Sequence, residues 1–315
     1  MITTKLNILI LGGNGFIGSH LVEALKDEHQ VTVFDKSPNL FVEEYADVNY
    51  VYGDFGSTDL LSQVLDNKHV VYHLLSTTVP FTADINPIFD IESNLIGTVK
   101  LLDMIVEKGI ERFVYSSSGG TVYGKSHYLP MDEEHPCNPV GSYGIVKNTV
   151  ERYIQMYALK NKFSYLIARP SNPYGPAQNY KKNQDLIAKL IYSGMHQEEV
   201  TIWGDGSATR DYIYIDDLTD FFKIAGLSKE TGVFNVGSGT GKSVNQIILA
   251  LSDIIEHMPS IIYTDKKGSF VDEVVLDIRY ATEKFDWTPK IPLEKGLRHH
   301  HKWMKLNCKV WFLYY

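Results

Sequence analysis

Residues 6–18 read Leu6-Asn-Ile-Leu-Ile-Leu-Gly12-Gly-Asn-Gly15-Phe-Ile-Gly18. The apolar run predicts a short buried strand, and the glycines after it predict a tight turn that opens a helix. Glycines at this spacing let the backbone approach a pyrophosphate closely, and the positive end of the helix attracts the anion. A glycine-rich turn also joins many ordinary strands to helices, so the interpretation needs support from elsewhere in the chain.

That support comes from Asp35, which follows the next predicted strand about twenty residues after the central glycine of the turn. A carboxylate there can accept hydrogen bonds from both ribose hydroxyls of a dinucleotide and would repel a 2′-phosphate. Asp35 therefore favours NAD over NADP, although a basic neighbour such as Lys36 could accommodate the phosphate. Asp54, after a third predicted strand, is placed to reach the adenine edge, but a loop carboxylate or a helix cap explains it nearly as well.

Short apolar runs alternate with helical patterns through the first half of the chain, which is typical of βαβ units and a parallel sheet. Prolines cluster with Gly175 at 170–176 and predict a crossover into a second domain. We expect an α/β fold, a Rossmann-type doubly wound parallel sheet with a smaller C-terminal α/β substrate domain. The cofactor domain is expected to comprise residues 1–170 plus about 211–240, and the substrate domain 171–210 plus about 241–315. The strands expected in the first half are 7–11, 31–34, 49–52, 69–74, 112–116 and 164–168.

Composition narrows the class of partner. The chain has 315 residues, 44% of them hydrophobic, and a net charge of -8, which argues against nucleic-acid binding because that affinity comes mainly from clustered lysine and arginine. Its two cysteines lie far apart without a metal-binding pattern, so no metal and no disulfide framework are expected. The N-terminal apolar run is too short for a signal peptide or a membrane span, which predicts a cytoplasmic protein with a small-molecule partner and no membrane contact.

Two later motifs suggest other chemistry. The run Gly237–Ser243 resembles a phosphate-binding P-loop, but Val236 stands where that motif requires glycine, so we interpret Ser243 as the cap of a helix. The run His299–His301 suggests a metal, but three consecutive histidines cannot all face one ion from a helix. We therefore predict that these histidines lie on a solvated face.

The catalytic candidates are Tyr143 and Lys147, which are one turn apart on one face of a predicted helix. Free tyrosine titrates at about pH 10, so it acts as a base only where nearby positive charge stabilises the phenolate. Lys147 and an oxidised nicotinamide would both supply that charge. The serine run 116–118 lies at the C-terminal end of a predicted strand, where ligands bind in open α/β sheets.

With these motifs the chain resembles the extended short-chain dehydrogenase/reductases, in the NAD-dependent epimerase/dehydratase family that includes UDP-galactose 4-epimerase. The resemblance covers essentially the whole chain, and the motifs occur in family order. The further matching segments are Gly53-Asp54, His73-Leu-Leu-Ser76, Asn94 with Gly97-Thr98, Val122-Tyr-Gly124, Arg169-Pro-Ser-Asn-Pro-Tyr-Gly-Pro176, Trp203-Gly-Asp-Gly206, Arg210-Asp-Tyr212, Phe234-Asn-Val-Gly237 and Trp287-Thr-Pro289. The resemblance implies a nucleotide-sugar enzyme with tightly bound NAD, and a homodimer that pairs the helices at 95–106 and 150–159.

The resemblance also implies roles for individual residues. Tyr143 is the expected catalytic base, Lys147 bonds the nicotinamide ribose and tunes Tyr143, and Ser118 assists at the substrate oxygen. Choosing Ser118 over Ser117 requires a local bulge, because many relatives have one residue fewer before Val-Tyr-Gly. The residues expected to contact NAD are Gly12, Gly15, Phe16, Ile17, Gly18, Asp35, Lys36, Asp54, Phe55, Leu74, Asn94, Ser116, Tyr143, Lys147 and Pro170. Those expected to contact the nucleotide sugar are Thr78, Ser118, Asn172, Arg210 and Lys267.

Two departures from the family bear on the substrate, which we expect to be a UDP- or dTDP-linked hexose. Family members often place Arg and Asp before the last strand to hold the nucleotide, whereas Lys267 and Phe270 stand there in this chain. An ungapped match also places Val274 where epimerases confined to non-acetylated sugars tend to carry a bulky aromatic residue. A small side chain would leave room for an N-acetyl group, so we expect UDP-N-acetylglucosamine and UDP-N-acetylgalactosamine to be interconverted at least as well as the non-acetylated pair.

The expected reaction is 4-epimerisation by transient oxidation at the sugar C4. A 4,6-dehydratase is disfavoured, because relatives of that type carry Asp-Glu after the catalytic residue and Gly119-Gly120 stand there in this chain. A 4-keto-6-deoxysugar reductase is the main alternative, because it needs the same Ser, Tyr and Lys set. Asp35 counts against it, since net reductases more often use NADPH. A non-catalytic dinucleotide sensor is a further alternative, but it has no need for Tyr143 and Lys147.

Overall fold

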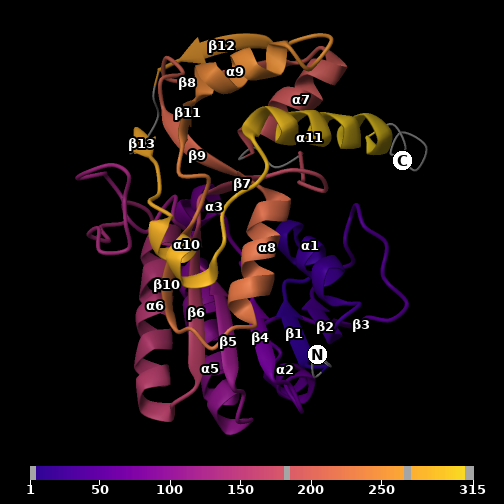
Figure 1. Cartoon of the computed structure of the whole chain (residues 1–315), viewed down its shortest axis with the longest axis vertical. Coiled ribbons are helices and arrows are strands. Elements are labelled where there is room, and N and C mark those ends of the chain that lie inside the picture. Colours follow the sequence, from indigo (N-terminus) through magenta and orange to yellow (C-terminus); the bar gives the residue numbers. More distant parts are fainter. Residues whose placement is uncertain (1–4, 181–184, 266–270, 309–315) are drawn as a thin grey trace.

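The computed structural model describes residues 5–180, 185–265 and 271–308 of the chain. The main sheet consists of β1 (Asn7–Leu11), β2 (Gln30–Asp35), β3 (Asn49–Tyr52), β4 (Val70–His73), β5 (Arg112–Ser116), β6 (Ser164–Pro170) and β10 (Gly232–Val236). All seven strands are parallel, in the order β10-β6-β5-β4-β1-β2-β3. This sheet forms the lower body of the molecule in Figure 1. The expected Rossmann-type α/β fold is confirmed, and the chain order reverses between β1 and β4, where doubly wound sheets bind ligands.

Side chains of β1 alternate between two hydrophobic cores, one on each face of this sheet. Ile8 and Ile10 point into the core shared with α1 (Phe16–Leu25) and α8 (Ile215–Gly226). Leu9 and Leu11 point into the opposite core, which is shared with α2 (Thr58–Val64), α5 (Gly97–Glu107) and α6 (Ser142–Asn161). Because successive strand residues face opposite sides, a strand buried on both faces needs a continuous apolar run, which is the pattern that predicted it.

A smaller region occupies the upper part of Figure 1. Its strand β9 (Thr209–Tyr214) pairs with β7 (Asn172–Tyr174), β11 (Gly241–Ser243) and β13 (Glu273–Val274), and β8 (Glu199–Trp203) pairs with β12 (Ser260–Thr264). The helices that follow the crossover here are α7 (Leu186–His196), α9 (Val244–Ser252) and α11 (Leu293–Asn307), whereas α10 (Arg279–Phe285) packs against β10. α8 and β10 follow the crossover in the chain, but α8 packs on the main sheet and β10 is part of it. We therefore propose two domains that are each discontinuous in the sequence.

Two local expectations have different outcomes. Pro173 lies inside β7, so regular structure continues through the proline cluster that predicts the crossover. Among the described residues β7 pairs with β9 alone, and proline is tolerated on such an edge strand because no ladder partner needs its missing N–H. Ser243 caps α9 as predicted, since its hydroxyl accepts the N–H of Gln246 at 3.1 Å and the Gln246 side chain accepts the N–H of Ser243 at 2.9 Å.

The solvated face predicted for three consecutive histidines is wrong for two of them. His300 and His301 are buried on α11, while His299 is exposed. This helix packs against α7 and β9, and its buried residues recur at helical spacing through positions 296, 297, 300, 301 and 304. Neither ring nitrogen of His300 has a hydrogen-bond partner among the described residues.

Residues 80–96 form short helices, whereas the sequence predicts a helix only from residue 95. The helices α3 (Pro80–Ile85) and α4 (Pro87–Asp90) each begin at a proline, which suits the first turn because the N–H of that position has no helical partner. A π-helix, η1 (Ile91–Ile96), then leads into α5. None of the helices in the described ranges is both long enough and apolar enough to cross a membrane.

Candidate active site

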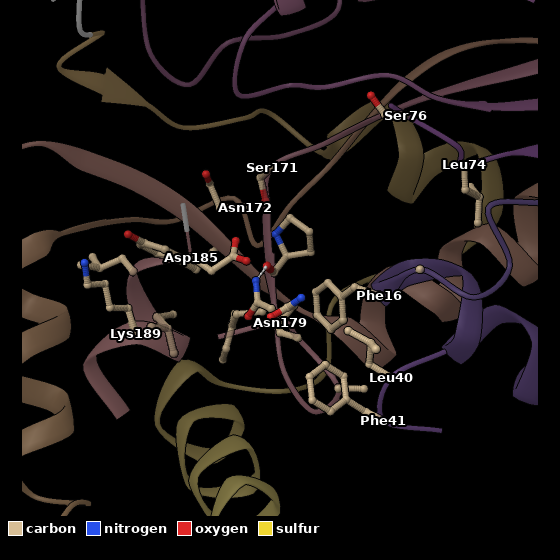
Figure 2. Close-up of a pocket in the computed structure, with 18 of the residues that line it drawn as sticks. Phe16, Leu40, Phe41, Leu74, Ser76, Ser171, Asn172, Asn179, Asp185 and Lys189 are labelled. Atoms are coloured by element: carbon tan, nitrogen blue, oxygen red, sulfur yellow. Dashed lines mark hydrogen bonds between the residues drawn. The ribbon is translucent and has the colours of Figure 1, made fainter. Parts of the chain in front are cut away.

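A cavity of about 930 Å³ lies between the main sheet and the smaller region. The glycine-rich turn, the loop after β2, the segment after β4 and residues of β8 and β9 form its walls. Figure 2 shows Phe16, Leu40 and Phe41 gathered on one wall, while Asp185 and Lys189 lie on another. The predicted site residues that line it are Gly12, Gly15, Phe16, Asp35, Leu74, Asn172 and Arg210. The cavity therefore joins the predicted cofactor turn to two predicted substrate residues.

The glycine-rich turn brings the backbone close to the cavity. Gly12 has a φ of +82°, and a Cβ there would lie 2.9 Å from the backbone nitrogen of Leu75. A Cβ on Gly18 would lie 2.2 Å from the carbonyl oxygen of Gly12, so α1 can begin this close to the turn only because these residues are glycine. A narrow turn at a helix N-terminus fits the pyrophosphate of a dinucleotide.

Asp35 stands at the end of β2, and its carboxylate accepts the N–H groups of Asn14 at 3.0 Å and Lys36 at 2.7 Å. Burial raises the pKa of Asp35. The side chains of Lys36 and Asp54 are exposed and lie 3.4 Å apart. The N–H of Gly56 and the Lys36 ammonium lower the pKa of Asp54. A carboxylate on the cavity wall, with the nearby lysine paired to another carboxylate, fits the free ribose of NAD.

The loop after β2 connects the glycine-rich turn with the smaller region. The Asn39 side chain donates to the Asn14 carbonyl at 2.8 Å and accepts the N–H of Phe41 at 2.7 Å. The Phe41 ring lies 5.6 Å from Trp303 and 6.1 Å from Tyr180, measured between ring centroids. This loop thus lines the cavity from one half of the molecule and packs on aromatic residues of the other.

Three predicted cofactor residues, Ile17, Phe55 and Pro170, are not among the residues that line the cavity. Ile17 is within α1, and Phe55 is buried with its ring 5.3 Å from that of His73. Pro170 ends β6, and its carbonyl accepts the N–H of Gly119 at 2.8 Å. Direct contact with NAD stays a prediction for each of them.

Tyr143 and Lys147 lie together in the first turns of α6. The Lys147 ammonium donates to the Ser116 carbonyl at 2.8 Å and lies 5.6 Å from the centre of the Tyr143 ring. Burial lowers the pKa of Lys147 to about 8, while the carboxylates of Asp90 and Glu151 act in the opposite direction. Burial also raises the pKa of Tyr143 to about 12, and a hydrogen bond with Ser76 counters part of that rise. Since Ser76 lines the cavity, it links the cavity to this pair.

The two candidate serines have different surroundings. The hydroxyl of Ser117 is buried and donates to the carboxylate of Glu151. Ser118 is partly exposed, and its carbonyl accepts the N–H groups of Thr121 at 3.3 Å and Val122 at 3.1 Å in a tight turn. Because the hydroxyl of Ser117 is bonded to Glu151, the structure supports the choice of Ser118 as the residue that assists at the substrate oxygen.

Sequence patterns did not indicate the buried ion pair beneath this turn. The guanidinium of Arg169 donates to both carboxylate oxygens of Glu151, at 3.1 and 2.6 Å, and to the hydroxyl of Tyr123 at 2.9 Å. Tyr123 in turn donates to the side chain of Asn235 at 2.6 Å. This network joins β6, α6 and β10 below the serine turn. A clue was available in Glu151, which stands four residues after Lys147 on the same helix.

A second buried carboxylate, Asp90, was also not predicted as a site residue. It accepts hydrogen bonds from two predicted site residues, Thr78 at 2.7 Å and Asn94 at 2.9 Å. The Asn94 side chain also accepts the N–H of Thr77 at 2.9 Å. The hydroxyl of Thr78 is therefore bonded inside the protein, and Asn94 supports the loop that carries Ser76.

The predicted substrate residues are only partly described. Asn172 donates to the Asp211 carbonyl at 2.9 Å, and Arg210 donates to the Val271 carbonyl at 2.7 Å. Burial lowers the pKa of Arg210. Lys267 and Phe270 lie outside the described residues.

The role expected for Val274 is not supported by its position. Its side chain is buried in a small core with Val122, Tyr123, Met131 and Leu276, and it is not part of the cavity wall. A tyrosine at this position would overfill that core, so the position of Val274 gives no support to the argument that it leaves space for an N-acetyl group.

Known proteins resemble this chain over nearly its whole length. The chain is 31% identical over 298 residues to the UDP-glucose 4-epimerase of Mycolicibacterium smegmatis, covering 92% of this chain and 95% of that one. It is 30% identical over 316 residues to the dTDP-4-dehydro-6-deoxyglucose reductase of Escherichia coli, covering 97% and 99%. Among solved structures, UDP-glucose 4-epimerase of Thermotoga maritima, with UDP-glucose, matches with a TM-score of 0.92 and 30% identity, covering 96% of this chain and 100% of that one.

The family follows from a broader comparison that agrees with the cavity and the tyrosine–lysine pair. The model of the NAD-dependent epimerase/dehydratase family matches residues 8–237, which include the glycine-rich turn, Asp35, Tyr143, Lys147 and Arg210. The chain is therefore an NAD-dependent enzyme that belongs to the NAD-dependent epimerase/dehydratase family, within the extended short-chain dehydrogenases.

Proposed function

We propose that this enzyme is a nucleotide-sugar 4-epimerase that acts on a UDP-hexose or UDP-N-acetylhexosamine. The observation that carries the proposal is the cavity itself, because it runs from an NAD-type turn past Ser76, which bonds Tyr143, to Asn172 and Arg210. Asp35 and the pairing of Lys36 with Asp54 favour NAD that is recycled in place over consumed NADPH. Two of the relatives described above bear the name UDP-glucose 4-epimerase, which agrees with this choice.

In the proposed reaction Tyr143 removes the proton of the sugar 4-hydroxyl while the hydride at C4 departs. Bound NAD supplies the hydride acceptor and donor. Ser118 holds the 4-oxygen, and Lys147 stabilises the phenolate by its charge. The 4-keto sugar rotates in the cavity, Tyr143 returns the proton, and the hydride returns to the opposite face. Asn172 and Arg210 would hold the pyrophosphate during that rotation.

The test is incubation of the purified protein with a panel of UDP- and dTDP-sugars without added cofactor. We expect the C4 epimer to form, and inclusion of both acetylated and plain sugars determines the substrate range. Failure with every sugar, together with NAD(P)H-dependent consumption of a 4-keto-6-deoxy nucleotide sugar, would assign the reductase alternative that the E. coli relative represents. A cytoplasmic location, expected from the sequence, is part of the same proposal.

A further inference from the structure

The carboxylate of Asp90 lies at the junction of three segments. Asp90 is fully buried at the end of α4, where the chain passes into the π-helix η1. One carboxylate oxygen accepts from Thr78 at 2.7 Å and Asn94 at 2.9 Å. The other accepts from the hydroxyl of Ser142 at 2.8 Å. These donors belong to the loop after β4, the π-helix and the first residue of α6.

Two partners of Asp90 lead to Tyr143, one through the chain and one through Ser76. Ser142 immediately precedes Tyr143 in α6. Thr78 is two residues from Ser76, and the Ser76 hydroxyl donates to the Thr78 carbonyl at 2.9 Å. Since Ser76 also bonds Tyr143, Asp90 closes a ring of contacts around the phenol.

A second carboxylate holds the same helix start from the solvent side. The N–H of Ser142 donates to Asp84 of α3 at 2.8 Å, whereas the residue before it, Gly141, offers no side chain to cap α6. Asp84 is exposed and is not among the charges that shift the pKa of Tyr143 or Lys147. It therefore provides a matched control for Asp90, because both carboxylates bind Ser142 and only one is buried near the reacting groups.

We propose that Asp90 is a positioning residue that fixes Tyr143 against the loop carrying Ser76 and supplies the buried negative charge that balances Lys147. Glu151, the other carboxylate that acts on Lys147, is already paired with Arg169. This inference rests on the proposed use of Tyr143 as the acid–base residue.

The electrostatic effect of Asp90 has a definite sign. A nearby anion disfavours the phenolate and favours the ammonium, so Asp90 raises the pKa of both Tyr143 and Lys147. Loss of its charge should lower both values. Among the described residues, the other titratable groups that interact with this pair are Glu151 on α6, Tyr115 on β5 and His73 on β4, and they are unchanged in the variant.

The experiment compares Asp90→Asn, Ser142→Ala and Asp84→Asn in the full-length protein. Tyrosine ionisation is followed by ultraviolet absorbance, and the curve of Tyr143 is obtained by subtracting the same variant carrying Tyr143→Phe. We expect the pKa of Tyr143 to fall by about one unit in Asp90→Asn and to stay unchanged in Asp84→Asn. This titration needs no substrate, so it remains informative if no sugar is epimerised.

Kinetics then test the positioning role. We expect Asp90→Asn and Ser142→Ala each to lower kcat about tenfold with KM within about twofold, because the phenol is displaced while the pyrophosphate contacts remain. The acid limb of the kcat profile should also move to lower pH in Asp90→Asn alone. An Asp90→Asn titration identical to that of Asp84→Asn would overturn the electrostatic part. Wild-type kcat in Ser142→Ala would overturn the positioning part, even if Asp90→Asn failed to fold.

Discussion

Tyr143 carries the proton in the proposed reaction, so its replacement is the most direct test at the scale of single residues. We expect Tyr143→Phe to abolish turnover and to leave NAD bound, because the glycine-rich turn that receives the pyrophosphate is a separate part of the cavity. Ser118→Ala should lower kcat about a hundredfold. Turnover is measured with the epimerised sugar, and NAD is measured after denaturation. Turnover of Tyr143→Phe within about tenfold of the parent would contradict the assignment.

The serine pair offers a comparison within one turn. Ser117 donates to the buried Glu151, so Ser117→Ala should reduce stability more than it reduces the chemical step. If Ser117→Ala proved the more damaging change in kcat at equal stability, the catalytic serine would be Ser117.

Buried histidines make stability depend on pH. Burial lowers the pKa of His20 to about 4 and those of His73 and His300 to about 3, from 6.5. Below pH 6.5 these histidines bind protons in the unfolded chain but stay neutral in the folded chain. The free energy of unfolding therefore falls as pH decreases toward 4. Urea unfolding between neutral pH and pH 4 measures that decline.

The variant His300→Leu isolates one of these contributions. It removes a titrating group and two ring nitrogens without partners, so it should flatten the pH dependence and raise stability at pH 7 by about 1 kcal/mol. His299→Leu, at an exposed position of the same helix, is the control and should not raise stability. Lower stability of His300→Leu at pH 7 would show that the imidazole contributes more to packing than its unpaired nitrogens cost.

The sequence predicted some site residues far better than others. Tyr143 and Lys147 are close in the chain, so their spacing alone predicts that they share a helix face. Asp90 binds Ser142 across 52 positions, and no local pattern reports that contact. Thr78 was expected to contact substrate, but its hydroxyl bonds Asp90, because the short helices after β4 turn this carboxylate inward.

At the scale of elements, the pair Arg169–Glu151 ties β6 to α6. Both side chains are almost fully buried, at 4% and 1% exposure, so removing one charge leaves the other unpaired in the core. We expect Glu151→Gln to lower the free energy of unfolding by about 3 kcal/mol. The exposed pair Lys108–Asp66 provides the control, since Asp66→Asn should cost less than about 1 kcal/mol. Denaturant titration of both variants measures the difference, and equal costs would contradict the argument.

The elements of the main sheet were more predictable than those of the smaller region. A strand that is buried on both faces consists of a continuous run of apolar residues, so the sequence shows where it lies. The predicted bounds of β1 match the observed ones. The three-residue strands β7 and β11 have no such run, because pairing with β9 and not burial defines them. The face of α11 was mispredicted for a similar reason, since the burial of His300 depends on contacts with α7 and β9.

For the whole molecule, we propose a homodimer through α5 and α6. The described surface of α6 exposes apolar side chains, including Ile145 at 51%, Met156 at 38% and Leu159 at 85%. The double variant Met156→Glu/Leu159→Glu should be monomeric by light scattering at micromolar concentration, because each protomer would bring two buried charges to the interface. Leu249→Glu on α9, which replaces another highly exposed leucine, at 70% exposure, should keep the parent mass. A monomeric parent protein would contradict the proposal.

The contact of Phe41 with Trp303 joins the loop beside the glycine-rich turn to α11 in the smaller region. Because this loop also lines the cavity, residues from both halves of the molecule hold the cofactor end of the cavity. An epimerase returns its hydride to the sugar that gave it and has no reason to exchange its cofactor. With NAD recycled in place, as proposed, the flux through the reaction would follow the supply of sugar nucleotide and would not depend on the ratio of oxidised to reduced nicotinamide in the surrounding pool.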